Sequence, residues 1–256
     1  MGMRSLLPVV LPFFVWTTSS LRVQSAGLQP AMIGQGPDSV AAKLYYPATA
    51  KAAGTQAGVQ FYCEVTTAGQ ARHTEIIVGK QLRPFGDVVE RALHQGRFSP
   101  ARAGGKAVPV MLGGTVLFLN STGQPTILVS LATAEKEKAV SGRNYIQPQM
   151  ITSYADLERK CITFARSNVL LPTPYPTAEA LMNVDEKGDL TGTKLLSESK
   201  AGWGAMLLKA CEGTKFIPAQ ANGKPVTGQF NLTIDYRMMT DPDHVLTGSH
   251  LRPRER

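Results

Sequence analysis

The segment at residues 97–108 reads RFSPARAGGKAV, and the segment at residues 215–226 reads KFIPAQANGKPV. The offset between them is constant, since 216 − 98 = 118 and 226 − 108 = 118. Over residues 88–108, 8 of 21 positions recur at residues 206–226, whereas composition alone gives about one or two. The chain therefore contains an internal duplication.

The residues around the first segment predict its secondary structure. Apolar and polar side chains alternate over 59–65, which indicates a half-buried strand. A turn at Gly69 leads into a returning strand over 74–78, and the single apolar stripe over 85–95 predicts a helix. The quoted segment then launches a last strand over 108–118. The same order recurs around the second segment.

This pattern predicts an α+β fold of two tandem β-β-α-β units, each a small antiparallel sheet packed on one helix. The Phe-x-Pro-Ala part of each copy joins helix to last strand, because proline stops a helix and the aromatic ring fills the gap. An apolar run over 126–131 is expected to extend the first sheet. The expected organisation is a signal peptide at 1–25, a lead-in at 26–44, a first domain at 45–133, a connector with a helix at 134–170, a second domain at 171–240 and a polar tail at 241–256.

The first 25 residues have the pattern of a secretory signal peptide. Arg4 gives a positive start, residues 6–16 are mostly apolar, and Val23-Gln24-Ser25 is a small-residue cleavage pattern. The apolar run has 11 residues (16 − 6 + 1), whereas a spanning helix needs roughly 20. We therefore expect cleavage after about Ser25, export, and no membrane span in the mature chain, with a retained anchor as the less favoured alternative.

The net charge of +8 would suit a nucleic acid or an anionic membrane surface. Lys and Arg are scattered, however, and no run of basic and aromatic residues resembles a nucleic-acid face. A basic solvated surface is the favoured interpretation. We expect no nucleic-acid partner.

Three cysteines follow the signal peptide: Cys63, Cys161 and Cys211. Each lies at a position of apolar periodicity, which predicts small buried side chains. Export would permit one disulfide among them, and that alternative stays open. Because there is no Cys-x-x-Cys and no Cys/His cluster, we expect no metal site and no cofactor.

The sequence gives little support for catalysis. Its four histidines, at positions 73, 94, 244 and 250, have no evident partner in the sequence. No Gly-rich phosphate loop, Gly-x-Ser-x-Gly or His-Glu-x-x-His motif is present. We therefore expect that the protein is not an enzyme and has no catalytic residues.

The ordered set of features, present twice, resembles the TonB C-terminal domain family. The resemblance covers roughly residues 46–119 and 175–237. The matching residues are Tyr46-Pro47, Val65, Gly69, Val78, Ala92, Phe98-Ser99-Pro100-Ala101, Gly105-Lys106 and Phe118 in the first copy, and Tyr175-Pro176, Val184, Gly188, Ala210, Phe216-Ile217-Pro218-Ala219, Gly223-Lys224-Pro225-Val226 and Tyr236 in the second.

The resemblance implies a periplasmic protein that binds partners by strand pairing, in connection with TonB-dependent transport. In the family, the last strand accepts a short segment of an outer-membrane receptor. An exposed strand edge offers unpaired backbone groups, so main-chain bonds supply affinity with little demand on sequence. The carry-over places the binding edges at Val110, Leu112, Val116, Leu117, Phe118, Phe230, Leu232, Ile234 and Tyr236.

Proline at Leu117, or at whichever last-strand residue directs its N–H outward, is then expected to abolish partner capture while thermal stability stays near wild type. Two alternatives remain open. One is a structural or assembly protein of the cell envelope with no free strand edge. The other is an anchored energy transducer, which the lack of a long Pro-rich spacer disfavours.

Overall fold

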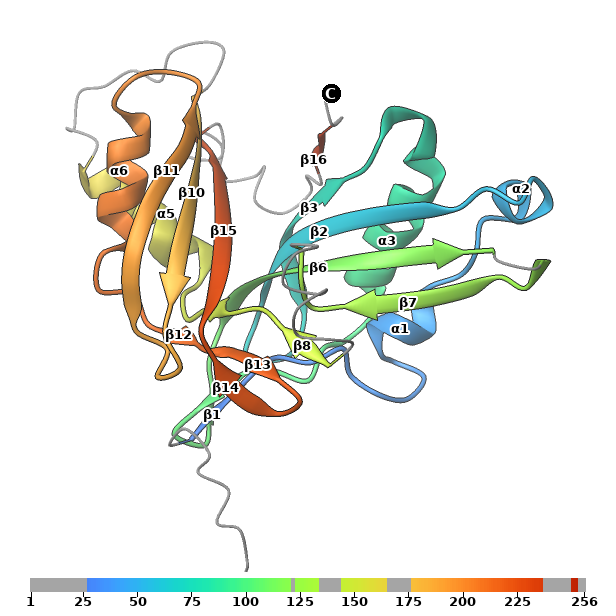
Figure 1. Cartoon of the computed structure of the whole chain (residues 1–256), viewed down its shortest axis with the longest axis horizontal. Coiled ribbons are helices and arrows are strands. Elements are labelled where there is room, and N and C mark those ends of the chain that lie inside the picture. The colour runs from blue at the N-terminus through green and yellow to red at the C-terminus, as the bar shows by residue number, and fades with distance from the viewer. Residues whose placement is uncertain (1–26, 121–122, 134–143, 165–175, 237–249, 253–256) are drawn as a thin grey trace, which may run out of the picture.

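The computed structural model describes residues 27–120, 123–133, 144–164, 176–236 and 250–252. It is a mixed α+β fold in which helices pack against small, mainly antiparallel sheets (Figure 1). The expected signal peptide lies outside the described residues. Within these ranges, no helix combines the length and apolar character needed to cross a membrane.

The first sheet is built on a hairpin. Strand β2 (Ala57–Val65) pairs with β3 (Ala71–Ile77) on one side and with β6 (Val110–Leu119) on the other, in both cases antiparallel. Helix α3 (Arg83–Gln95), preceded by the 3-10 turn η1 (Lys80–Leu82), packs against β2 and β3. Its apolar stripe is buried, as periodicity predicts.

Further strands widen this sheet to seven. The strand order is β12-β9-β6-β2-β3-β16, and β7 also pairs with β6. The apolar run that was predicted to extend the first sheet does so as β7. The added strands are β7 (Thr126–Ser130), β9 (Gln149–Met150), β12 (Phe216–Ile217) and β16 (His250–Arg252), the last of which lies within the expected polar tail and runs parallel to β3.

The second sheet has three antiparallel strands in the order β11-β10-β15. They are β10 (Thr177–Val184), β11 (Leu190–Glu198) and β15 (Gly228–Asp235). Helix α6 (Trp203–Cys211) packs on β10 and β11, and α5 (Tyr154–Phe164) packs on α6. The helix expected in the connector is α5, and its Leu157 and Cys161 belong to the core beneath this sheet.

Short elements complete the chain. The two small sheets have the orders β1-β4-β5 and β14-β13-β8. Their strands and the short helices are β1 (Leu28–Gln29), α1 (Val40–Lys43), α2 (Ala48–Ala52), β4 (Arg102–Ala103), β5 (Lys106–Ala107), β8 (Tyr145–Ile146), β13 (Ala219–Ala221) and β14 (Lys224–Val226).

The duplicated segment makes the same contact in both copies. Phe98 N donates to Gly69 O, and Phe216 N donates to Gly188 O, each at 2.9 Å. Both aromatic side chains are buried. The helix-to-strand joint is therefore tied to the turn of its own hairpin, which is a structural role.

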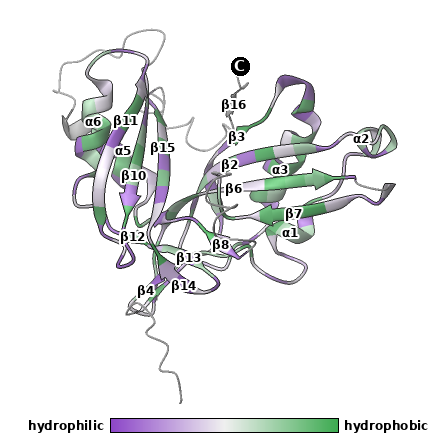
Figure 2. Cartoon of the chain, in the orientation of Figure 1, coloured by the Kyte–Doolittle hydropathy of each residue, from purple (hydrophilic) through white to green (hydrophobic). Residues whose placement is uncertain are grey.

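Each of the two hydrophobic cores includes a residue from the other half of the chain. Apolar residues run along β6 and β7 on the first sheet (Figure 2). Met111 of β6 packs in the core of the second sheet, whereas Ile217 of β12 packs in the core of the first. Met111 and Ile217 thus hold the two halves together, because each packs in the core of the other half.

Candidate strand-edge binding site

Strand β6 lies inside its sheet, so the expected free edge at 110–118 is wrong. One side pairs with β2 over Val110–Phe118. The other side pairs with β7 from Thr115 to Leu119, and Met111 pairs with Met150 of β9. The chain has added its own strands where a partner strand was expected.

The hairpin bond fixes the direction of each backbone group on β6. Thr66 N donates to Gln70 O (2.9 Å). The backbone N–H and C=O groups of Thr66, and of every second residue before it, therefore point to β3. The intervening residues of β2 face β6, and their partners on β6 face back toward them. The residues whose groups turn to β2 are Val110, Leu112, Val116 and Phe118. Leu117 turns to β7, so none of these five offers an open backbone group.

Strand β15 ends the second sheet, and β10 is its one neighbouring strand among the described residues. Tyr236 N donates to Pro176 O at 2.9 Å, which sets the alternation along the pair. Phe230, Leu232 and Ile234 are in phase with Tyr236, and they too direct their backbone groups to β10. Their side chains are buried. These four residues therefore cannot contact a partner strand directly, which corrects the expected site residues.

The outward backbone groups belong to the polar residues between them. By the same alternation, Asn231 and Thr233 turn their N–H and C=O groups away from β10. The Asn231 side chain is held by Glu179 of β10, whose Oε1 accepts from Asn231 Nδ2 at 2.6 Å. The polar alternation of this strand was visible in the sequence, but its hydrogen-bonding phase was not.

The beginning of β15 is covered. A Cβ atom added at Gly228 would lie 2.6 Å from Ala219 Cβ and 2.9 Å from Tyr145 Oη. This end of the strand therefore packs through one face against β13 and β8.

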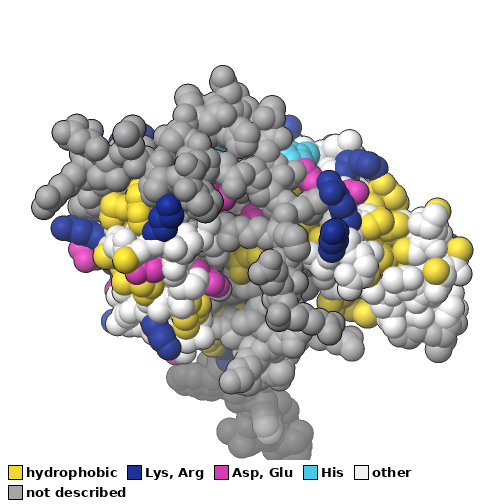
Figure 3. Space-filling view, turned by 90° about the horizontal axis from the view of Figure 1, so that it is seen from above, with side chains coloured by type: hydrophobic (Ala, Val, Ile, Leu, Met, Phe, Trp, Pro, Cys, Tyr) yellow, Lys and Arg dark blue, Asp and Glu magenta, His cyan; other side chains and the backbone are white. Residues whose placement is uncertain are grey.

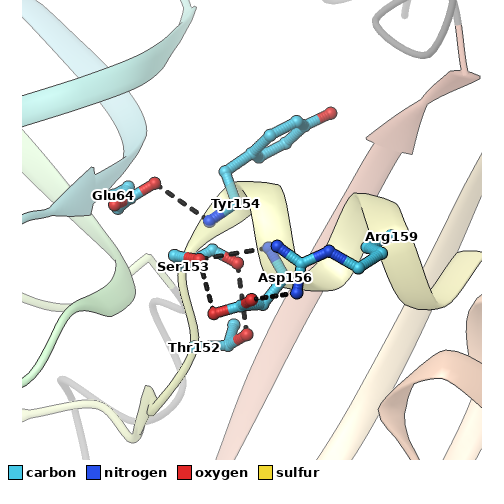
Figure 4. Close-up of polar contacts among 6 residues, drawn as sticks. All are labelled: Glu64, Thr152, Ser153, Tyr154, Asp156 and Arg159. Atoms are coloured by element: carbon cyan, nitrogen blue, oxygen red, sulfur yellow. Dashed lines mark hydrogen bonds and ion pairs between the residues drawn. The ribbon is translucent and has the colours of Figure 1, made fainter.

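A buried polar cluster joins the two sheets close to this edge. Glu64 of β2 accepts a hydrogen bond from Tyr154 N, the first residue of α5, through Oε2 at 2.9 Å (Figure 4). At the same helix start, Asp156 N donates to Ser153 Oγ (3.1 Å). A carboxylate at a helix N-terminus satisfies an otherwise unpaired N–H and suits the helix dipole. Glu64 thereby fixes α5, and with it the second core, on the first sheet.

His73 completes the cluster. Its ring stacks on Tyr154, with centroids 4.4 Å apart and planes at 20°. His73 has φ 48°, a left-handed conformation uncommon outside glycine, and it lies where the β2–β3 register shifts. The irregularity aims the imidazole at α5. Sequence reasoning missed this pairing because His73 meets Glu64 across a bulge and Tyr154 from a distant helix.

Burial favours the neutral form of both titratable groups. It raises the pKa of Glu64, against the lowering effect of the Tyr154 N–H bond, and it lowers the pKa of His73, assisted by the charge of Arg72. Glu64 Oε2 and His73 Nε2 lie 3.7 Å apart. Because both pKa shifts oppose charging, we treat this contact as packing rather than as an ion pair.

The raised pKa gives a prediction for Glu64→Gln. Above the ordinary pKa of 4.5, the unfolded carboxyl loses its proton before the folded one, so the stability contributed by Glu64 falls as pH rises through the folded pKa. The neutral amide avoids this loss. We expect the free energy of unfolding of the variant, relative to wild type, to increase from pH 4.5 upward in urea titrations.

Asp156→Asn is the matched control, because the Ser153 hydroxyl and nearby positive charges lower the pKa of Asp156. Its deficit relative to wild type should be largest at neutral pH and shrink in acid. A pH-independent difference for Glu64→Gln would contradict the assigned shift.

The remaining surface and thiols show no second cluster of this kind among the described residues. On the face in Figure 3, Lys and Arg side chains lie in several separate places. All three cysteines are buried and form no disulfide, and burial raises the pKa of Cys161 and Cys211 to about 12. In the described ranges, no three His, Cys, Asp or Glu side chains gather as metal ligands.

Comparisons of the chain with protein-family models, with curated proteins and with solved structures gave no match.

Proposed function

We propose that this chain is an exported, periplasmic protein of TonB C-terminal type that binds an extended segment of an envelope protein as an added strand on β15. The observation that carries the proposal is the position of β15 at the end of its sheet, with the backbone groups of Asn231 and Thr233 turned outward. An outer-membrane receptor is the favoured partner.

In this proposal the two halves are copies of one β-β-α-β module that now have different tasks. The shared order of hairpin, helix and last strand supports this, as does the repeated bond between the joint and the turn. The first copy is the support, because β6 is already paired on both sides. The second copy is the binding module.

The chemistry of capture follows from strand geometry. Two outward residues present two N–H donors and two C=O acceptors to an antiparallel or parallel partner. Side chains that alternate along the bound segment would meet the polar outer face of the sheet, where Glu179 and Asn231 lie. Main-chain bonds then supply affinity, and this face supplies selectivity.

Two observations favour a second candidate, an assembly protein of the envelope without a free edge. The first sheet has closed the edge of its own last strand, and Glu64 and Tyr154 bind the two sheets to each other. Such internal closure is what a rigid structural piece requires. The two candidates differ in whether β15 accepts a strand.

The test is Thr233→Pro, compared with Thr193→Pro on β11 at the opposite end of the same sheet. Register and alternation turn the backbone of Thr193 outward as well, so both prolines remove one outward N–H and no ladder bond. A peptide selected from a random library on the wild-type protein is the probe. We expect Thr233→Pro to lose binding, Thr193→Pro to keep it, and both to melt near wild type.

Amide exchange gives an independent readout. In the free protein the amides of Asn231 and Thr233 should exchange much faster than those of Phe230 and Leu232, and they should slow when the peptide binds. Equal protection of all four amides without peptide would refute the free edge and favour the assembly protein.

A further inference from the structure

Strand β7 is the least protected edge among the described strands. It pairs with β6 on one side only. Among strands of five residues or more, the other edges carry charge or a covering strand, since β11 contains Lys194 and Glu198, β15 ends at Asp235, and β3 is covered by β16. Residues 123–133, which include β7, contain no Lys, Arg, Asp or Glu. Natural edges normally carry such charges because they prevent pairing between chains.

The same alternation shows which groups β7 offers. Leu128 pairs with Leu117, which turns toward it, so Thr126, Leu128 and Ser130 face β6. Ile127 and Val129 therefore turn outward. Leu131, one residue past the strand, also turns its C=O away from β6. This carbonyl accepts a hydrogen bond from Gln147 N (2.9 Å).

The strand is also chemically symmetric. It reads Thr-Ile-Leu-Val-Ser, so reversal exchanges Thr126 with Ser130 and Ile127 with Val129, each for a residue of the same character. Leu128 is the centre, and the residue is 49% exposed. A strand that matches its own reverse suits an isologous contact, in which a two-fold axis sets the same patch against itself.

We infer that β7 pairs with β7 of a second copy of this chain, antiparallel, with the two-fold axis at Leu128. In this arrangement Ile127 and Val129 exchange backbone hydrogen bonds with Val129 and Ile127 of the other copy. The two Leu128 side chains face each other in a non-hydrogen-bonded pair, with Cα atoms about 4.5 Å apart. The pairing joins two first sheets through their outer edges.

The position of β7 permits this contact. The strand lies along the lower edge of the first sheet in Figure 1, away from β15. An edge without charged residues also lets two positively charged chains meet without setting like charges against each other on the paired strands. A second copy is favoured over an unrelated peptide because a two-fold axis at Leu128 sets Thr126 against Ser130 and Ile127 against Val129, so that each side chain meets one of like character.

Sedimentation velocity of the purified chain over a wide range of concentration tests the inference. We expect a reversible dimer that Leu128→Lys weakens at least about tenfold, because two like charges would meet at the axis. Leu196→Lys on β11 is the matched control, since Leu196 is 43% exposed on another edge, and it should leave the dimer unchanged. Circular dichroism melting checks that each variant is folded.

Cysteine crosslinking then tests the register. Leu128→Cys should form a covalent dimer under mild oxidation, because the introduced thiol meets the same thiol of the other copy, and the buried native thiols should not interfere. Thr126→Cys alone should not crosslink, whereas a mixture with Ser130→Cys should. A monomer at every concentration, a dimer unaffected by Leu128→Lys, or crosslinking by Thr126→Cys alone would overturn the inference. Because β15 takes no part, Thr233→Pro should dimerise normally.

Discussion

Gly188→Ala should lower the free energy of unfolding by at least about 3 kcal/mol. Gly188 has φ +83°, and an added Cβ would lie 2.0 Å from Phe216 O. The obstructing atom is backbone and cannot rotate away. Phe216 N also bonds to Gly188 O, so moving the strand apart would break the joint that the duplicated segment builds.

Gly223→Ala separates the cost of a positive φ from the cost of the clash with backbone. Gly223 has φ +74°, and its added Cβ would meet nothing within 4 Å. The free energy of unfolding of this variant should therefore fall by only about 1 kcal/mol, the cost of a left-handed conformation at a residue with a side chain. Urea unfolding of both variants measures the difference. Equal losses would show that the contact between the hairpin turn and the joint is unimportant.

The first copy should behave in the same way. An added Cβ at Gly69 would lie 2.2 Å from Phe98 O, at φ +75°. Gly69→Ala is therefore expected to be as costly as Gly188→Ala. The repeated cost would identify the joint as the feature that the duplication has kept.

Leu117→Pro should cost about 3 kcal/mol or more, opposite to the neutral effect that the sequence predicted. Leu117 turns its backbone to Leu128 of β7, so proline removes an internal ladder bond. Its ring also opposes the pairing of a strand that lies between two neighbours. Chemical denaturation with Thr233→Pro as the edge reference measures the contrast. Equal stability of the two variants would mean that β7 does not pair with β6.

Much of the secondary structure could be predicted from the sequence, because it follows from local periodicity. The alternation from Val59 to Val65 gave β2, and the apolar stripe beginning at Val88 gave α3. The burial of Cys63, Cys161 and Cys211 also followed from their places in these patterns. The lead-in was harder, because α1 is a single turn with little periodicity of its own.

The sequence predicted the strand that contains the candidate site. Along this strand it assigned the alternate residues whose backbone groups point to β10, rather than those whose groups point outward. Phe230 and Asn231 are neighbours in sequence, yet one directs its backbone to β10 and the other away from it. Apolar periodicity shows which side chains are buried. It does not show which backbone groups are paired, since that depends on the register with a distant strand.

The cluster of Glu64, His73 and Tyr154 shows the same limit. Its members come from a strand, a bulge and a helix, and 90 residues separate Glu64 from Tyr154. No local pattern in the sequence connects them. Their contact and their pKa shifts exist only because the chain folds back on itself.

By itself, the sequence determined the duplication, the main strands and helices, and the faces that are buried, because these depend on residues close together in the chain. The tertiary structure alone decided which strand edges are open. Met150 lies 39 residues beyond Met111 (150 − 111), and it closes part of the edge of β6, whereas β15 meets no such segment among the described residues. Whether a strand edge is paired depends on segments far away in the chain, and the local sequence of those segments does not specify which strand they pair with.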